Sequence, residues 1–464
     1  MPSLSEPFVL KTLAQASAAL YTQTLPAEIL WRAKQRVLDT LGCLVAGYEA
    51  GISSQIRDYV LSQGGKAEST LLPNGEKTTT ALVALAHATY IFGLELADAA
   101  PRGTVHPGCE IVSVAMALAE RQGSSGLALL AAIVAGYEVE IRFGRALHPH
   151  AFYKGWSTIG LLGAIGPAVT SAMLLKQDSD GIERTLGSVL SLLPAATGRV
   201  SQAGSVKWLV GGHACATGLM AAEMAGRGTQ GSAQALNIWL PVISEKNAPE
   251  RLTEGIDANG HFTQWELLSG VLTKYYATVG PIAAPLDAVF SLMKTHPIKA
   301  QDIKAIRINC TKRTAIFNNP APDSDHTARA SLPYCVAVAI CTQDPAQLLG
   351  PAYEPSRLQD PTLLRMAQRV LISENEDYEN QYPAHSLCNV SIQLQDDCEF
   401  SIEVDRTQNP RYLKPSDEDI EAKFRLIATP SLGTEKTERI IQLVKNLDAL
   451  DNVQSIMEAL RPER

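Results

Sequence analysis

Residues 95–110 read Glu-Leu-Ala-Asp-Ala-Ala-Pro-Arg-Gly-Thr-Val-His-Pro-Gly-Cys-Glu and separate two apolar, alanine-rich segments. The pattern predicts helices over residues 81–96 and 111–120, because both segments stay apolar over several turns. Between them, two prolines and two glycines prevent one continuous helix, since proline lacks an N–H and glycine leaves the backbone unrestrained. The chain is therefore predicted to build a helical core around a loop at this point.

This loop concentrates the side chains of acid–base chemistry, namely Asp98, Arg102 and His106. Charged groups on a loop at the mouth of a helical core are well placed for proton transfer. The residues alone also leave open a surface turn whose charges are simply solvated. The rest of the chain is needed to decide between these interpretations.

Composition indicates an ordinary globular protein. The 464 residues are 46% hydrophobic and 19% charged, which is enough for a large core and for more than one domain. The net charge of −8 and the pI near 5.7 argue against a nucleic-acid partner or an anionic membrane surface. The uncharged run 159–175 is somewhat short for a membrane span of ~20 residues, so a buried core helix is predicted there.

The sequence gives no sign of a bound metal or nucleotide. Eight cysteines occur without a Cys-x-x-Cys pair, which makes zinc ribbons and redox motifs improbable and favours a reducing compartment. No glycine-rich phosphate loop follows a strand. The first residues lack the charged and apolar regions of a secretory signal. We therefore expect no cofactor, no metal and a cytoplasmic location.

The change from helical to strand periodicity along the chain predicts two domains. Residues 8–47 give two helices, the second opened by Pro26, and residues 79–227 give helix after helix. Near residue 273 the pattern changes to strands with helices between them, and it returns to amphipathic helix near the end. The strands are expected over 303–311, 388–394 and 399–404, and the helices over 331–341, 361–369, 416–424 and 437–460. The predicted fold class is mainly α, with a large all-helical domain over residues 1–269, completed by 406–464, and a smaller α+β lid domain over 270–405.

Two further places carry functional side chains. A second basic and aromatic loop spans residues 148–157 and ends in Trp156 and Ser157. Lys207 enters an otherwise apolar helical region, where an unpaired ammonium group is costly. The alternative for Lys207 is a side chain that extends along the helix and leaves its charge in water.

Short motifs in a fixed order now point to a family. Each is weak alone, but together they extend over nearly the whole chain: Arg36-Val-Leu-Asp-Thr-Leu-Gly-Cys, Glu95-Leu-Ala-Asp98 through His106-Pro-Gly, Gly136-Tyr-Glu-Val, Ser205-Val-Lys207, Lys274-Tyr-Tyr, Ser331-Leu-Pro-Tyr334 and Glu421-Ala-Lys-Phe. In this set the chain resembles the MmgE/PrpD family, which includes 2-methylcitrate dehydratase, cis-aconitate decarboxylase and iminodisuccinate epimerase.

The resemblance implies a homodimer of subunits with a helical domain and an α+β lid. It also implies an active site between domain and lid that acts on a small organic acid without metal or nucleotide. The family's catalytic histidine corresponds to His106, its acidic loop residues to Glu95 and Asp98, its lysines to Lys207 and Lys274, and its lid tyrosine to Tyr334.

These residues suit one chemical problem, which is negative charge developing on a carbon beside a carboxylate or carbonyl. His106 would take or return a proton, and the Asp98 carboxylate would orient its ring. Lys207 would stabilise the enolate-like intermediate, and Tyr334 would donate a proton from the lid. We expect Lys274, Arg102, Glu95, Ser157 and Trp156 to contact the substrate. On the residues alone, His106 could instead cap a helix, Asp98 could be a turn residue, and Tyr334 could be a core aromatic.

The sequence departs from the family pattern in ways that bear on the substrate. Ala97 stands where a second acid is common, and Ser157 stands where a histidine is usual. Residues 278–283 read Thr-Val-Gly-Pro-Ile-Ala, although family members often carry polar or cationic groups there. Several partners for carboxylates are therefore missing, and a substrate less polar than citrate is predicted.

Three functions remain open at this level. The first is a lyase, either a dehydratase or a decarboxylase. The second is an epimerase or isomerase that uses the same proton abstraction, and the third is a binding protein that kept the fold and lost the reaction.

Overall fold

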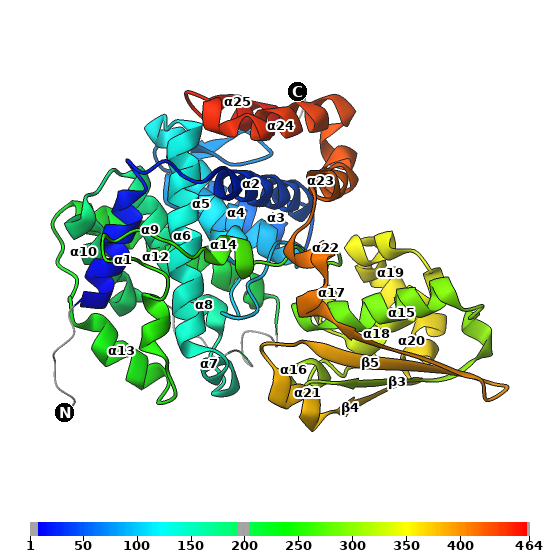
Figure 1. Cartoon of the computed structure of the whole chain (residues 1–464). Helices are drawn as coiled ribbons and strands as arrows, with labels where there is room; N and C mark the ends of the chain where they lie inside the picture. Colours follow the sequence, from blue (N-terminus) through cyan, green and yellow to red (C-terminus); the bar gives the residue numbers. More distant parts are fainter. Residues whose placement is uncertain (1–7, 194–197, 199–203, 462–464) are drawn as a thin grey trace. The chain divides into compact units, whose positions relative to one another are not determined.

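The computed structural model describes residues 8–193, 198 and 204–461, and its chain divides into two compact units (Figure 1). One, here called the helical unit, comprises Met1–Gly93, Ala97–Leu272 and Pro415–Arg464. The other, here called the mixed unit, comprises Leu94–Leu96 and Thr273–Lys414. The fold is mainly α with a smaller α+β region, as predicted from the sequence.

The helical unit is built from helices and one two-stranded hairpin. Its longer helices are α1 (Phe8–Ala19), α2 (Ala27–Gly47), α3 (Ser53–Gln63), α4 (Thr80–Leu94), α5 (Pro107–Gln122), α6 (Gly126–Leu147), α9 (Ile165–Leu174), α10 (Ser179–Leu192), α12 (Val206–Gly226), α13 (Ala235–Ile243), α23 (Asp417–Leu432) and α24 (Thr434–Lys445). The short elements are α7 (His150–Tyr153), α8 (Thr158–Leu162), α14 (Glu266–Ser269), α25 (Gln454–Ala459), β1 (Ser69–Thr70) and β2 (Lys77–Thr78).

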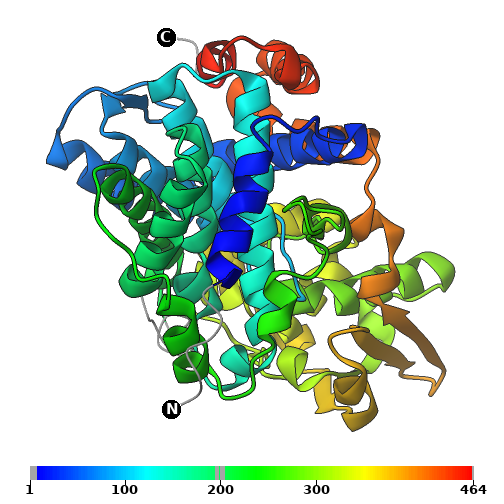
Figure 2. The ribbon, with the colours of Figure 1, turned by 60° about the vertical axis from the view of Figure 1, so that its left-hand side comes forward.

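Helix α6 lies in the middle of this unit and packs against α5 and α9, as Figure 1 and Figure 2 show. Small residues make the approach possible. A side-chain carbon at Gly136 of α6 would collide with Thr170 of α9, and one at Gly166 would collide with Glu140 of α6. The alanine- and glycine-rich composition of residues 79–227 therefore has a packing cause, because large side chains would hold these helices apart.

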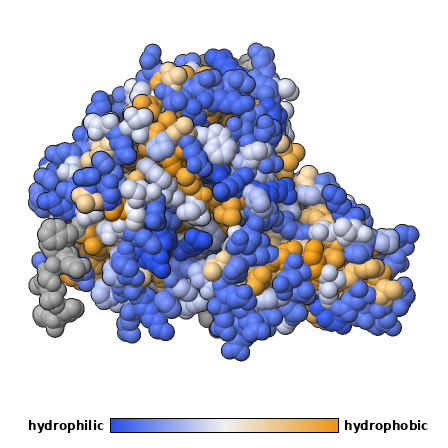
Figure 3. Space-filling view, viewed as in Figure 1, coloured by the Kyte–Doolittle hydropathy of each residue, from blue (hydrophilic) through white to orange (hydrophobic). Residues whose placement is uncertain are grey.

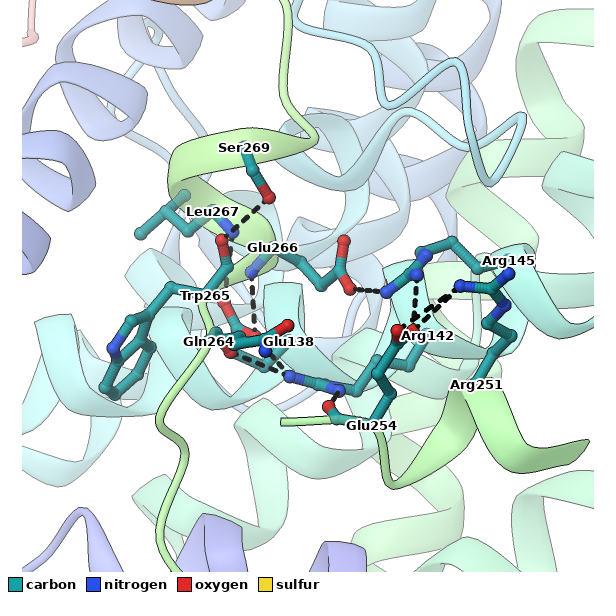
Figure 4. A network of polar contacts seen from close by, with 10 residues as sticks. All are labelled: Glu138, Arg142, Arg145, Arg251, Glu254, Gln264, Trp265, Glu266, Leu267 and Ser269. Atoms are coloured by element: carbon teal, nitrogen blue, oxygen red, sulfur yellow. Dashed lines mark hydrogen bonds and ion pairs between the residues drawn. The ribbon is translucent and has the colours of Figure 1, made fainter. Parts of the chain in front are cut away.

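A polar network fixes the segment 254–269 against α6 (Figure 4). The buried Glu138 carboxylate accepts from the backbone N–H groups of Glu266 and Leu267, each at 3.0 Å. The guanidinium of Arg142 donates to Glu138 at 3.3 Å and to the Gln264 carbonyl oxygen at 2.9 Å. Buried charge is tolerated here because the Glu138 carboxylate accepts from N–H donors and the Arg142 guanidinium donates to oxygen atoms.

The mixed unit contains a four-stranded sheet with the order β4-β3-β5-β6. Strand β3 is parallel to β4 and antiparallel to β5, and β5 is antiparallel to β6. Helix α15 packs against β5, β6 and α18. The strands are β3 (Ile303–Cys310), β4 (Val370–Glu374), β5 (Leu387–Leu394) and β6 (Glu399–Asp405). The helices are α15 (Ala283–Thr295), α16 (Lys312–Ala315), α17 (Asp325–Arg329), α18 (Leu332–Thr342), α19 (Pro355–Leu358), α20 (Pro361–Ala367), α21 (Glu376–Gln381) and α22 (Pro410–Leu413).

Two predictions from the sequence are corrected. The buried core helix expected over 159–175 is divided into α8 and α9, because the helix ends at Gly163 before a second one begins. The helix expected over 437–460 is likewise divided into α24 and α25, with the short turn Leu447–Ala449 between them. Among the described helices, none combines the length and apolarity needed to cross a membrane. Figure 3 shows mostly hydrophilic residues on one face, with hydrophobic residues between them.

Candidate functional site

The loop between α4 and α5 is organised by the buried carboxylate of Asp98. Its Oδ1 accepts from the backbone N–H of Gly108 at 2.9 Å, and its Oδ2 accepts from the Tyr137 hydroxyl at 2.7 Å. The Arg36 Nη1 atom lies 4.0 Å from Oδ2. Because Gly108 is in the first turn of α5, Asp98 satisfies one of the N–H groups that a helix start leaves unpaired.

Burial raises the pKa of the Asp98 carboxyl, and Arg36 and the two hydrogen-bond donors oppose that rise. All three neighbours offer positive charge or a hydrogen, which an ionised carboxylate accepts and a protonated one accepts less well. Arg36 and Tyr137 belong to motifs quoted from the sequence, but no role was assigned to them. Arg36 ends the polar run Arg32-Ala-Lys-Gln-Arg36 of α2, so its charge alone did not distinguish it in the sequence.

His106 is half-buried at the start of α5, and its orientation is set by the main chain of Asp98. The Nδ1 atom lies 3.0 Å from the Asp98 carbonyl oxygen, and the ring meets Phe92 edge-on at 5.6 Å between centroids. A carbonyl oxygen only accepts, so the neutral ring carries its proton on Nδ1 and leaves Nε2 as the basic nitrogen. The sequence predicted that the carboxylate would orient the ring, whereas the contact comes from the backbone of the same residue.

The alternative interpretation of His106 as a helix cap is not what the structure shows. His106 occupies the residue before α5, but its side chain makes no capping hydrogen bond. The carboxylate of Asp98 caps that turn instead.

Thr104 joins the two loops that the sequence analysis treated separately. The hydroxyl of Thr104 and Nδ1 of His148 are 2.6 Å apart, and the Thr158 hydroxyl donates to the Thr104 carbonyl oxygen at 2.6 Å. Ser157 is buried and caps α8, where its hydroxyl accepts from the Gly160 N–H at 3.4 Å. The half-buried Trp156 donates through Nε1 to the Ile243 carbonyl oxygen at 3.2 Å.

Two predicted cations differ in their surroundings. Lys207 is half-buried in the first turn of α12, a helix that also packs against α5 and α8. Arg102 is exposed. Arg102 is therefore a weaker candidate for substrate binding than Lys207, because a solvated charge gives less electrostatic stabilisation.

In the mixed unit, Glu95 and Lys274 form a buried ion pair. The Lys274 Nζ atom lies 3.6 Å from Glu95 Oε2, and both side chains are at most 5% exposed. Glu95 has a positive φ of 56°, which few residues other than glycine adopt. The neighbouring Leu94 carbonyl oxygen accepts from Arg329, which holds this short segment in place. The charge of Lys274 is thus already matched by a carboxylate of the same unit.

Tyr334 lies in the core of the mixed unit. The side chain is fully buried in α18, and its hydroxyl donates to the Ala352 carbonyl oxygen at 2.7 Å. Burial raises the pKa of this hydroxyl. The Tyr334 hydroxyl is thus held by a main-chain acceptor, and its role as a proton donor stays a prediction.

Two further acids, Glu110 of α5 and Glu140 of α6, are fully buried. Neither carboxyl oxygen of Glu110 has a hydrogen-bond partner among the described residues. Burial raises the pKa of Glu110 well above its usual value, and the neighbouring Glu140 raises it further. Burial and Asp98 raise the pKa of Glu140 in the same direction. The buried thiol Cys215 donates to the Glu110 carbonyl oxygen at 3.2 Å and completes this cluster.

These two acids predict a loss of stability as the pH rises above about 4.5. Their pKa in the folded state lies above the unfolded value near 4.5, so their contribution is complete below that value and is lost as the pH rises through the folded pKa. Replacing both by glutamine, which resembles the protonated acid, is expected to flatten the fall in Tm that begins above pH 4.5. Thermal unfolding over a pH series measures it, with the exposed Glu245→Gln as control. An unchanged slope in the double variant would show that the pair does not titrate in this range.

Within the described part of the chain, no group of three or more His, Cys, Asp or Glu side chains is placed to hold a metal ion.

Comparisons with known proteins cover nearly the whole chain. Residues 11–240 match the family model of the MmgE/PrpD N-terminal domain, and residues 276–449 match that of the MmgE/PrpD C-terminal domain. The chain is similar to cis-aconitate decarboxylase of Aspergillus terreus, with 24% identity over 95% of this chain and 93% of the relative. It is also similar to human cis-aconitate decarboxylase, with 24% identity over 98% and 94% of the two chains. Similarity to the cis-aconitate decarboxylase-like protein oryM of Aspergillus oryzae is 21% identity over 95% and 94%.

Proposed function

Because the chain belongs to the MmgE/PrpD family, we propose that it is a lyase that moves a proton at a carbon beside a carboxylate or carbonyl of an organic acid. Its relatives named as cis-aconitate decarboxylases are matched from end to end, which favours a lyase over an epimerase. The observation that carries the proposal is the position of His106, whose Nδ1 faces the Asp98 carbonyl oxygen.

In this proposal, His106 is the catalytic base and acid. With its proton held on Nδ1, the neutral ring uses Nε2 to take a proton from the substrate, and the resulting imidazolium can return it. The Asp98 backbone stabilises that imidazolium by accepting its Nδ1–H. Lys207 supplies positive charge to the electron pair that develops on carbon.

Both lyase outcomes use these groups with balanced steps. In a decarboxylation, the ring starts as the imidazolium, after Nε2 has taken a proton from water. The bond from the α-carbon to the carboxylate breaks, CO2 leaves, and the electron pair remaining on carbon takes that proton, which restores the neutral ring. In a dehydration, Nε2 takes the α-proton, the C–O bond breaks, and the hydroxyl group leaves as water after receiving a proton. The relatives' names favour decarboxylation as the first reaction to assay.

The charges of the candidate residues, considered within each unit, favour a substrate with few carboxylates. Each carboxylate that leaves water needs a cationic or hydrogen-bonding partner. Lys274 is already paired with Glu95, Arg102 is exposed, and a serine stands at position 157. We therefore propose an organic acid with fewer carboxylates and a larger apolar part than citrate or aconitate.

A comparison of specificity constants tests this substrate class. Among cis-aconitate, 2-methylcitrate and mono- and dicarboxylic acids with an alkyl or alkenyl chain, we expect one of the less polar acids to have the highest kcat/KM. Product analysis by NMR identifies the lost group. If cis-aconitate or 2-methylcitrate is preferred, the proposed substrate class is incorrect.

Two features implied by the family remain predictions. They are the homodimer and the movement of the α+β region as a lid over the substrate, which would exclude water from the reaction.

A further inference from the structure

Arg406 is an arginine buried in the mixed unit, outside every motif identified in the sequence. It begins the short 3-10 helix Arg406–Gln408 that follows β6, and its side chain is 6% exposed. The Nη1 atom donates to the Gly280 carbonyl oxygen. The guanidinium carbon lies 4.9 Å from the centre of the Tyr412 ring. One end of the guanidinium is therefore held firmly.

The remaining edge of this guanidinium has no hydrogen-bond partner among the described residues. The Nε and Nη2 atoms are buried, and neither forms a hydrogen bond within the part of the chain that the structure describes. Together these two atoms form the edge of the arginine side chain that can donate two parallel hydrogen bonds to one carboxylate. A buried and unfilled edge of this kind is rare in folded proteins, because the lost hydration is not replaced.

Asp287, a carboxylate that acts electrostatically on Arg406, does not fill this edge. Its two oxygens accept from the hydroxyls of Tyr276 at 2.9 Å and Tyr412 at 2.5 Å. Burial raises the pKa of the Asp287 carboxyl, which weakens it as a counter-charge.

A second guanidinium adds to the positive charge. Arg313 acts on Arg406 as a like charge, and it donates to the Tyr382 hydroxyl at 2.5 Å. The Asp287 carboxylate already has two hydroxyl partners, and Arg411 acts on it together with Arg406. A buried guanidinium without a carboxylate of its own on its open edge favours an anionic ligand.

We propose that the Nε and Nη2 edge of Arg406 binds a carboxylate of a small organic acid. The group lies against Gly280, in the segment 278–283 that lacks charged side chains of its own. A Cβ at Gly280 would lie 3.4 Å from Nη1, so glycine keeps the backbone close to the guanidinium. Arg406 thereby brings a cation to this segment from a distant part of the sequence.

The carboxylate can come from either of two sources. It belongs either to the substrate or to a second organic acid that binds as an effector. Binding itself does not depend on the proposed lyase activity, and only the assignment to the substrate rests on that proposal.

Calorimetric titration of the full chain with cis-aconitate, itaconate, succinate and inorganic phosphate tests the proposal. We expect at least one carboxylic acid to bind more tightly than phosphate. Arg406→Lys and Arg406→Gln should each weaken that binding by about tenfold or more, because lysine keeps the charge but lacks the two-pronged edge. The matched control is Arg307→Lys, since Arg307 is an exposed arginine of β3 that donates to the Gln393 side chain at 3.1 Å, and it should change the Kd less than twofold.

Kinetics then separate the two sources. A rise in KM for the organic acid in Arg406→Lys assigns the carboxylate to the substrate. An unchanged KM together with lost binding of a non-reacting acid assigns it to an effector. If the chain turns over neither these acids nor any acid of the substrate panel given under the proposed function, the proposed function fails. The binding proposal is then still decided by the titrations.

Wild-type affinity in either folded Arg406 variant overturns the proposal. It is also overturned if the wild-type chain binds none of the three acids, or binds phosphate as tightly as them. Should neither variant fold, a crystal structure of the wild-type chain with the tightest-binding acid decides. A carboxylate within hydrogen-bond distance of Nε and Nη2 supports the proposal, and water or an empty space at that edge contradicts it.

Discussion

Replacing His106 with alanine is expected to lower kcat on the order of 10²-fold or more while the protein stays folded. The size of the effect follows from the loss of a positioned group that both takes and returns the proton. The fold should tolerate the change, because the His106 side chain is half-buried and makes no capping bond to α5. Steady-state kinetics with the best substrate measure the loss, and circular dichroism checks the fold.

Two comparisons make this result specific. His213→Ala removes an exposed histidine from α12 and should change kcat less than twofold. Added imidazole should restore part of the activity of His106→Ala, since it replaces the missing base and not a missing structural contact. Near-normal turnover in a folded His106→Ala protein would remove His106 from the mechanism.

The second large effect concerns stability. Replacing Asp98 with alanine is expected to lower the free energy of unfolding of the helical unit by about 3–5 kcal/mol, because a buried charge would lose its counter-charge. The variant leaves Arg36 without the carboxylate 4.0 Å away, and it removes the acceptor for the Tyr137 hydroxyl and the Gly108 N–H. Urea unfolding followed by circular dichroism measures the change in the midpoint.

A graded series of variants separates charge from hydrogen bonding. Asp98→Asn keeps an acceptor for Gly108 but loses the charge and places an amide NH2 where Oδ2 accepts from Tyr137, so it should fall between wild type and Asp98→Ala. Asp451→Ala removes an exposed acid of the same unit and should leave the midpoint nearly unchanged. Equal midpoints for wild type and Asp98→Ala would mean that this carboxylate does not support the loop.

Much of the fold could be predicted from the sequence, because the chain follows simple periodicity where its elements are long. The strand alternation of residues 303–311, for example, appears as β3 with buried residues at Ile306, Ile308 and Cys310. The edge strand β4 was missed because its pattern is weak. Only its first residue, Val370, is buried, so no alternation marks it.

The site was predicted less completely, because its side chains are brought together by contacts that the sequence does not display. The proximity of His106 to Asp98 was anticipated, but the contact comes from the main chain, which no side-chain pattern can reveal. Arg36 and Tyr137 lie far from Asp98 in the sequence and meet it only because α2 and α6 pack near the loop. Tyr334 illustrates the opposite case, since a motif residue proved to lie in the core.

Proton transfer at a carbon of an organic acid is the central claim, and NMR in D2O tests it most directly. The chain is incubated with the best-binding acid in D2O, with His106→Ala as a parallel sample. We predict a new product formed by loss of CO2 or water, and in a decarboxylation one deuterium bound to the carbon that lost CO2. His106→Ala should form this product far more slowly. Exchange of substrate hydrogen without a new product would identify an epimerase. Neither exchange nor product with any acid of the panel would contradict the account and leave a binding protein.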